Sequence, residues 1–306
     1  MSRDLFAITD EAVHARLLPW AIVAAETTPP TAPASALVIV PTYNERPNLE
    51  VLVQGIRAAG CAVLVVDDNS PDGTGEIADR LAAEDSGVSV VHRPGKLGLG
   101  TAEALGLARG ASRGYDLLIT MDADGSHHPS HLSALMAASR QGRRVAIGSR
   151  YIQGGAIVGW PAHRKALSHG ANLYCREILG LDVHDCTSGY RCYPREAVQR
   201  LQPEAIAADG YAFLIETLHR CVQLGIPVTE VPIRFEDRVA GRSKVSAAEI
   251  RKALTLVPRL RWDSLRRGRG PTPPPGEKRE VELLGTPRRP AARVRPPEPE
   301  GRVNRP

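Results

Sequence analysis

Short apolar runs alternate with segments of helical periodicity between residues 36 and 150, and no other feature constrains the fold of this chain as strongly. The runs occupy residues 36–40, 62–66, 88–92, 117–121 and 145–148, and the helical patterns between them cover 47–59, 74–83, 100–111 and 129–141. An uninterrupted apolar run is typical of a strand that is buried on both faces. Strands that alternate with helices through short connections indicate a mostly parallel sheet covered by helices on both faces. We therefore predict an α/β fold.

The pattern becomes less regular after residue 150. Helical patterns cover residues 162–179 and 211–224, and a strand pattern covers 228–235. A last amphipathic helix is predicted over 247–260, with Ile250, Leu254 and Val257 on one face. Such a helix either packs on the body of the protein or lies at a membrane interface, and packing is the commoner outcome.

Charge and proline content divide the chain into three parts. Residues 263–306 carry eleven Lys and Arg against six Asp and Glu, a net charge of +5 that equals the net charge of the whole chain. With ten prolines and few apolar residues, this segment cannot bury enough surface to order itself, so we predict a disordered basic tail. We expect residues 1–35 to be a flexible leader and linker, and residues 36–262 to form one folded domain. Because residues 1–262 balance 28 basic against 28 acidic side chains, a nucleic-acid-binding protein is disfavoured.

Apolar runs and cysteines bear on the compartment of the protein. No run approaches the roughly 18 apolar residues that span a bilayer, and the N-terminus lacks the basic start and apolar stretch of a signal peptide. We expect a cytoplasmic protein that is peripherally associated with the cytoplasmic face of a membrane. The basic tail either stays solvated or is weakly attracted to anionic lipid headgroups. The five cysteines are odd in number and lack paired metal-ligand spacing, so we interpret them as reduced thiols.

Polar clusters follow three of the predicted strands, at residues 42–45, 67–73 and 122–128. Ligands of open α/β sheets bind outside the carboxyl ends of the strands. These clusters are therefore predicted to meet in a single site.

Asp122 and Asp124 directly follow an apolar run. In an extended segment, residues two apart point the same way, so both carboxylates can face one ion. Mg²⁺ and Mn²⁺ prefer oxygen ligands and keep positions open for substrate phosphates. The two acids are therefore candidates for holding a metal-diphosphate, and the alternative is an acid-rich turn.

Two adjacent acids, Asp67 and Asp68, end the second run. A tight turn would not need both of them, and a carboxylate at this place can accept hydrogen bonds from a base or a ribose. The glycine-containing segment 96–102 follows the third strand rather than the first, which argues against a dinucleotide fingerprint. We interpret it as a loop and helix start close to the nucleotide.

Basic and hydroxyl side chains are predicted to converge on the opposite side of the site. Arg164, Ser168 and Asn172 are spaced to lie on one face of a helix, and Arg150 ends the fifth strand. Two arginines and a hydroxyl form a good phosphate receptor, although each arginine alone is more often a surface or ion-pair residue. Arg238 lies in a polar, glycine-containing segment that either is a solvated loop or closes as a lid over phosphates.

Taken together, six strings resemble the polyprenol-phosphate mannosyltransferases, a group within the inverting family 2 glycosyltransferases that includes dolichol-phosphate mannose synthase. They are Val-Pro-Thr-Tyr-Asn-Glu-Arg (40–46), Val-Asp-Asp-Asn-Ser-Pro-Asp-Gly-Thr (66–74), Lys-Leu-Gly-Leu-Gly-Thr-Ala (96–102), Met-Asp-Ala-Asp-Gly-Ser-His-His-Pro (121–129), Gly-Ser-Arg-Tyr (148–151) and Asp-Arg-Val-x-Gly-x-Ser-Lys (237–244). The segment 159–164 and the basic loop 238–244 point to the narrower group. The resemblance covers residues 36–262 in order.

The resemblance implies a GT-A fold, which is a Rossmann-like mixed, mostly parallel sheet, and a glycosyltransferase domain over residues 36–262. It implies GDP-mannose as donor, a polyprenyl phosphate lipid as acceptor, and Mg²⁺ or Mn²⁺ as cofactor. The guanosine would be held by Pro41, Tyr43, Glu45, Val65 and Asp67, and the metal by Asp122, Asp124 and Ser126. Ala123, Arg150, Arg238 and Lys244 would complete the donor site, and Arg150, Arg164 and Ser168 would receive the acceptor phosphate. Asp124, Arg150 and Arg164 are the catalytic candidates, and attachment to the membrane would use an anchoring partner protein or peripheral contact.

The implied chemistry needs no strong general base, because a phosphate monoester is largely dianionic at neutral pH. It needs in-line positioning at the anomeric carbon and neutralisation of the leaving diphosphate, and it predicts inversion of the anomeric configuration. The alternatives are a polyprenyl-phosphate glycosyltransferase that uses UDP-glucose or another sugar nucleotide, and a catalytically silent subunit that binds a sugar nucleotide.

Overall fold

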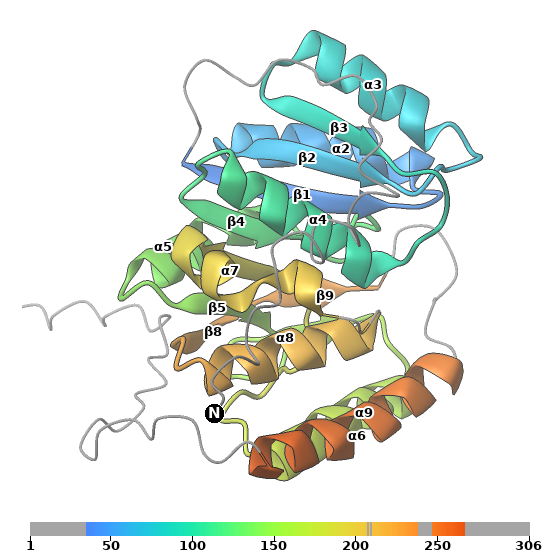
Figure 1. The fold of residues 1–306 in the computed structure, drawn as a ribbon. Coiled ribbons are helices and arrows are strands. Elements are labelled where there is room, and N and C mark those ends of the chain that lie inside the picture. The colour runs from blue at the N-terminus through green and yellow to red at the C-terminus, as the bar shows by residue number, and fades with distance from the viewer. Residues whose placement is uncertain (1–34, 207, 209, 238–246, 267–306) are drawn as a thin grey trace, which may run out of the picture.

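A seven-stranded sheet in the order β3-β2-β1-β4-β7-β5-β8 forms the centre of the computed structural model, which describes residues 35–206, 208, 210–237 and 247–266 (Figure 1). The strands are β1 (Ala36–Thr42), β2 (Ala62–Asp67), β3 (Val88–His92), β4 (Leu117–Thr120), β5 (Val145–Ser149), β7 (Arg191–Pro194) and β8 (Val228–Pro232). All neighbours pair in parallel except β7, which runs antiparallel to both β4 and β5. Two short strands, β6 (Ala156–Val158) and β9 (Arg234–Glu236), pair in parallel beside the main sheet.

Helices cover both faces of the sheet, as predicted. They are α2 (Arg46–Ala58), α3 (Thr74–Glu84), α4 (Leu99–Ser112), α5 (Leu132–Arg140), α6 (Ala162–Leu179), α7 (Arg195–Leu201), α8 (Tyr211–Gln223) and α9 (Ala247–Arg266), with 3-10 turns at Pro129–His131 and Pro203–Ala205. None of these helices combines the length and the apolarity that crossing a bilayer requires.

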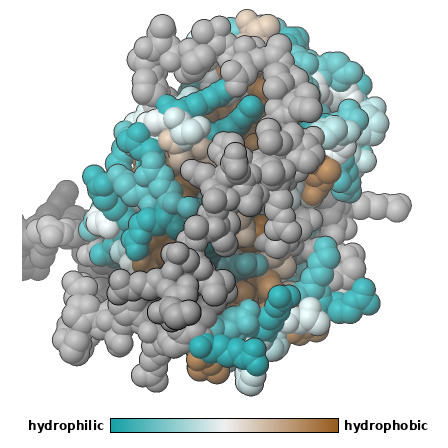
Figure 2. Space-filling model, viewed as in Figure 1, coloured by the Kyte–Doolittle hydropathy of each residue, from teal (hydrophilic) through white to brown (hydrophobic). Residues whose placement is uncertain are grey.

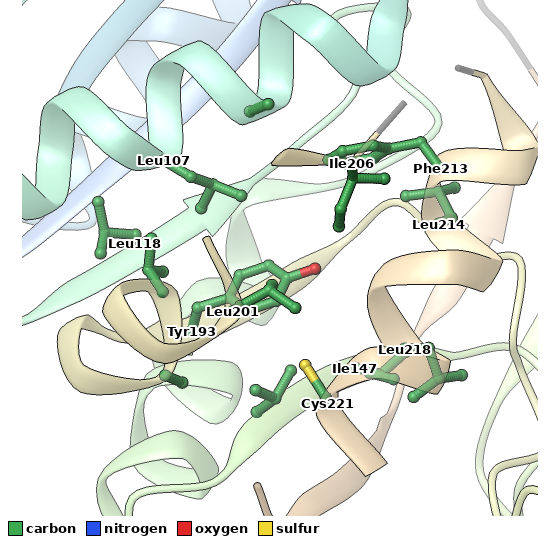
Figure 3. Close-up of a cluster of buried hydrophobic side chains, with 14 of the residues drawn as sticks. Leu107, Leu118, Ile147, Tyr193, Leu201, Ile206, Phe213, Leu214, Leu218 and Cys221 are labelled. Atoms are coloured by element: carbon green, nitrogen blue, oxygen red, sulfur yellow. The ribbon is translucent and has the colours of Figure 1, made fainter. Parts of the chain in front are cut away.

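Side chains of the central strands point alternately into two buried clusters. In β1, Leu37 and Ile39 join one cluster and Val38 and Val40 the other, as expected from the two-residue period of a strand. The first cluster includes side chains of α4, α7 and α8 together with Tyr193 of β7 (Figure 3). The second includes side chains of α2, α3 and α5. The predicted α/β fold is confirmed.

Most predicted elements lie within one or two residues of their observed bounds, and three differences have physical causes. The strand expected over 228–235 is two strands, because the chain leaves the main sheet after Pro232 and β9 then pairs with β6. Strand β7 was not predicted, since its sequence Arg-Cys-Tyr-Pro forms no apolar run. Helix α9 continues to Arg266, past the predicted domain boundary at residue 262.

Helix α9 packs against α6 and α8, in agreement with the commoner of the two predicted outcomes. Its expected apolar face is divided, however. Val257 is fully buried, whereas Leu254 is 49% exposed. The side chain of Ile250 lies outside the described part of the structure.

Candidate active site

A cavity of about 340 Å³ opens at the carboxyl ends of β1, β2, β4 and β5. Its wall includes residues from every strand end that the polar clusters had indicated. The lining residues are Pro41, Thr42, Tyr43, Glu45, Asp68, Lys96, Gly98, Leu99, Ala102, Asp122, Ala123, Asp124, His127, Arg150, Trp160, Arg164, Thr187, Ser188, Gly189, Gly210, Tyr211, Leu214, Phe235 and Asp237. The single site predicted from the strand ends is therefore one cavity.

Asp122 and Asp124 line this cavity directly after β4. The Asp124 carboxylate is buried and accepts hydrogen bonds at Oδ1 from the Ser126 amide at 3.1 Å and the Ser126 hydroxyl at 2.5 Å. The side chain of Asp122 is 31% exposed, and its backbone amide donates to Nδ1 of His127 at 3.1 Å. Ser126 thus orients the Asp124 carboxylate through hydrogen bonds and does not itself line the cavity.

His127 fixes the backbone of this acidic turn. Its ring stacks on Tyr190 with a centroid distance of 4.9 Å and meets Phe235 edge-on at 5.4 Å. Burial lowers the pKa of His127, and the nearby aspartates oppose that shift. A neutral imidazole with an unprotonated Nδ1 matches the hydrogen bond that it accepts from Asp122.

The two aspartates fit a hard divalent cation. A Cβ atom added at Gly189 would lie 3.5 Å from Oδ1 of Asp122, so the glycine keeps the space beside this carboxylate open. Within the described residues no cluster of three or more His, Cys, Asp or Glu side chains could hold a metal. Asp122 and Asp124 would supply two carboxylates, and such ions keep further positions for water and substrate oxygens.

The structure separates the five residues predicted to hold the guanosine into two groups. Pro41, Tyr43 and Glu45 line the cavity. Val65 is fully buried in the core, and the Asp67 carboxylate is buried and accepts hydrogen bonds from the hydroxyls of Thr42 at 2.9 Å and Ser70 at 2.6 Å. Neither Val65 nor Asp67 lines the cavity.

Asp68, the next residue along the chain, does line the cavity. Its carboxylate accepts from Nε of Arg93 at 2.5 Å and from the amides of Leu97 and Gly98 at 3.1 and 3.2 Å. Burial raises the pKa of Asp68, and the charge of Arg93 opposes that shift. The fully buried Arg93 also donates to the carbonyl of Gly98 at 2.8 Å.

The loop held by this ion pair places Lys96 at the cavity wall. Its ammonium group lies 4.3 Å from the centroid of the Tyr43 ring. The segment 96–102 thus forms a loop and the start of α4, as predicted, and its Lys96 lies beside Tyr43 at the cavity wall. The role of Arg93 was not recognisable from the sequence, because its partner Asp68 lies 25 residues before it and Gly98 lies five residues after it.

On the opposite side, Arg150 lies almost buried at the end of β5. Asp185 accepts from Nε and from Nη2 of this guanidinium, each at 2.7 Å, and Nη2 also donates to the Thr187 hydroxyl at 2.8 Å. Although burial would lower the pKa of Arg150, the Asp185 charge raises it above its ordinary value. Arg150 is therefore a permanent cation in a fixed orientation at the cavity wall.

Arg164 approaches the same part of the cavity from the first turns of α6. Its guanidinium carbon lies 3.9 Å from the centroid of the Trp160 ring, and Nη1 donates to Asp237 at 3.1 Å. Arg150 lies over the same indole at 5.7 Å. Trp160, which the sequence strings contained but to which no role had been assigned, thus lies between the two arginines.

Ser168 does not line the cavity. Its hydroxyl accepts a hydrogen bond from Tyr151 at 2.7 Å. Arg238 and Lys244 lie outside the residues that the structure describes.

The model of glycosyl transferase family 2 matches residues 37–202. The chain belongs to glycosyl transferase family 2. It is 48% identical to polyprenol monophosphomannose synthase from Mycolicibacterium smegmatis over 225 residues, covering 72% of this chain and 84% of that protein. It is 45% identical to undecaprenyl-phosphate mannosyltransferase from Micrococcus luteus over 236 residues, covering 75% and 97%. The family membership expected from the six strings is confirmed.

Among solved structures, the fold resembles glucosyl-3-phosphoglycerate synthase from Mycobacterium tuberculosis in complex with UDP. The TM-score is 0.55 at 21% sequence identity, over 74% of this chain and 80% of that one. This likeness confirms the GT-A type of fold.

Proposed function

We propose that this chain transfers mannose from GDP-mannose to a polyprenyl monophosphate and inverts the anomeric configuration. One observation carries the proposal: a carboxylate pair and two arginines line the same cavity. The carboxylate pair suits a metal-bound diphosphate, and the two arginines suit a phosphate monoester. The names of the two curated relatives support the sugar and the lipid.

The donor would lie along the ends of β1, β2 and β4. Pro41, Tyr43, Glu45 and Asp68 surround the place for the base, with Asp68 in the role that the sequence resemblance assigned to Asp67. Ala123 lies between the two aspartates and lines the same cavity.

Asp122 and Asp124 would hold Mg²⁺ or Mn²⁺ against the diphosphate. Such an ion, when bound, stabilises the negative charge that develops on the leaving GDP. Ser126 orients Asp124 through two hydrogen bonds and need not touch the ion. Arg238 and Lys244 remain candidates for neutralising the same diphosphate.

The acceptor phosphate would bind between Arg150 and Arg164. Its second pKa is about 6, so it carries almost two charges at neutral pH and can attack without a strong base. Two guanidiniums fixed at the wall would aim one oxygen at the anomeric carbon, on the side opposite the diphosphate. A single in-line displacement of this kind inverts the configuration.

Access to a lipid acceptor would require contact with a membrane, either directly or through an anchoring partner protein. Helices α6 and α9 lie side by side at one end of the molecule (Figure 1). They expose the large apolar side chains of Leu167, Leu173, Trp262 and Leu265, and apolar and hydrophilic surface alternate in this region (Figure 2). We propose peripheral attachment at the cytoplasmic face through these two helices.

The decisive experiment is a transfer assay with radiolabelled GDP-mannose, polyprenyl phosphate and Mg²⁺ or Mn²⁺. We expect labelled lipid whose anomeric centre, followed by NMR, is inverted. UDP-glucose in place of GDP-mannose should give little product. Faster transfer from UDP-sugars would favour the alternative donor, and GDP binding without transfer from any donor would favour a silent subunit.

A further inference from the structure

A buried chain of carboxylates connects Arg150 at the cavity wall to strand β8. Asp185 is completely buried, and besides the guanidinium it binds the backbone amide of Arg150, at 3.0 Å. Its own backbone amide donates to Oε1 of Glu230 at 3.0 Å. Glu230 is 2% exposed and lies in β8, paired with Ile147 of β5.

Glu230 holds two consecutive residues of the loop before β7. Its Oε2 accepts from the His184 amide and lies near Nδ1 of the same residue, each at 2.9 Å. Both carboxylate oxygens are therefore occupied by backbone N–H groups of the segment that carries Asp185. Neither Glu230 nor Asp185 lines the cavity.

This arrangement leaves the far end of Arg150 for a ligand. Nε and Nη2 of its guanidinium are committed to Asp185 and Thr187. Nη1 donates no hydrogen bond to a residue that the structure describes, and Arg150 lines the cavity beside Trp160 and Arg164. The direction of Nη1 thus depends on where the loop holds Asp185.

We propose that Glu230 is a positioning residue for the acceptor phosphate. Its carboxylate anchors the backbone amides of residues 184 and 185 and so fixes the position of Asp185. Asp185 in turn orients the guanidinium of Arg150. This inference rests on the proposed function, in which Arg150 receives that phosphate. A glutamine at position 230 would place an NH₂ group where a carboxylate oxygen now accepts from a backbone N–H. One of the two amides would then lose its acceptor, and the loop would shift.

The test is steady-state kinetics of Glu230→Gln with each substrate varied in turn. We expect the KM for polyprenyl phosphate to rise about tenfold, within the range of coupling in hydrogen-bond networks. The KM for GDP-mannose should stay within about twofold, since the proposed function assigns Arg150 to the acceptor phosphate. Glu196→Gln removes a half-exposed carboxylate that pairs with Arg143 and serves as the charge-matched control.

A double-mutant cycle tests whether Glu230 acts through Arg150. In an Arg150→Lys background, Glu230→Gln should raise the acceptor KM by less than about a further twofold, because the paired hydrogen bonds from the guanidinium to Asp185 are already lost. The proposal would be overturned if the fold-increases in acceptor KM of the two single variants multiplied in the double variant. It would also be overturned if Glu230→Gln left the acceptor KM unchanged or raised the KM values of both substrates equally. If Glu230→Gln does not fold, Glu230→Asp keeps the charge but cannot reach both amides, and the same comparisons apply. Absence of lipid product with the wild type would instead reject the proposed function.

Discussion

Asp67 and Asp68 are neighbours in the chain, yet their carboxylates have different surroundings. Asp67 is bonded to hydroxyls inside the protein, and Asp68 lines the cavity. The sequence resemblance assigned the guanosine contact to Asp67, whereas Asp68 is the acid that lines the cavity, because successive side chains of a strand point to opposite faces. The same reasoning placed Asp122 and Asp124 correctly at the cavity, since they are two residues apart.

Substitutions at Asp124 and Ser126 should have different kinetic effects. Asp124→Asn is expected to abolish metal-dependent transfer, with a loss of at least about a hundredfold. Ser126→Ala should weaken the apparent affinity for Mg²⁺ or Mn²⁺ about tenfold and leave kcat at saturating metal nearly unchanged, since Ser126 only orients Asp124. Metal titrations of transfer activity measure both. A Ser126→Ala variant as inactive as Asp124→Asn would show that the hydroxyl itself binds the metal.

Trp160 should contribute to acceptor binding through its ring. Trp160→Leu removes the surface on which Arg164 lies and should raise the acceptor KM about threefold to thirtyfold, the range of a partly buried cation–π contact. Trp160→Phe keeps a ring and should lose less. Equal losses in the two variants, measured with acceptor varied at saturating donor, would contradict a role for the ring face.

At the scale of elements, the loop between β3 and α4 depends on one buried ion pair. Arg93→Met would leave Asp68 buried without its cation, and we expect a loss of about 3–5 kcal/mol in the free energy of unfolding. Arg80→Met breaks only exposed pairs with Glu50 and Glu84 and should lower the free energy of unfolding far less, because solvent screens exposed ion pairs. Urea unfolding of both variants measures the difference, and similar losses would contradict the importance of burial.

The Arg93→Met variant should also respond to pH. Burial raises the pKa of Asp68 in the folded protein, and the cation that opposes this shift would be absent. The folded state then binds a proton more tightly than the unfolded state, so stability is regained as pH falls through the folded pKa. We expect the loss in free energy of unfolding, relative to wild type, to be smaller near pH 5 than at pH 8. A loss that is the same at both pH values in urea unfolding would contradict this.

A helix or strand could be predicted from the sequence where the residues of that segment alone show its hydrophobic pattern. The uninterrupted apolar run of β1 marks a buried strand without reference to any other residue. Arg191 in β7 is fully buried because its guanidinium donates to the carbonyls of Ser188, Cys186 and Leu214. Partners that lie on other elements leave no local pattern, which is why β7 and the connection from Glu230 to Arg150 emerge only in the structure.

For the whole molecule, the apolar side chains exposed on α9 predict membrane binding at one end. Replacing both Trp262 and Leu265 with Ser should reduce sedimentation with anionic lipid vesicles at least about fivefold, and high salt should weaken the binding of the wild type. Activity on a water-soluble short-chain acceptor should be retained. Val51→Ser removes an apolar side chain on α2 that is still more exposed and is the control. Unchanged sedimentation of the double variant would point to another surface or to a partner protein.

Strand β7 runs against its two neighbours and so divides the sheet. On one side, the ends of β1, β2 and β4 carry the candidate nucleotide and metal residues, and on the other, β5 and β8 support Arg150. Each half of the cavity is held by its own buried ion pair, Arg93 with Asp68 and Arg150 with Asp185. During evolution, acceptor preference could therefore diverge within such a scaffold while the machinery for the sugar nucleotide was inherited unchanged.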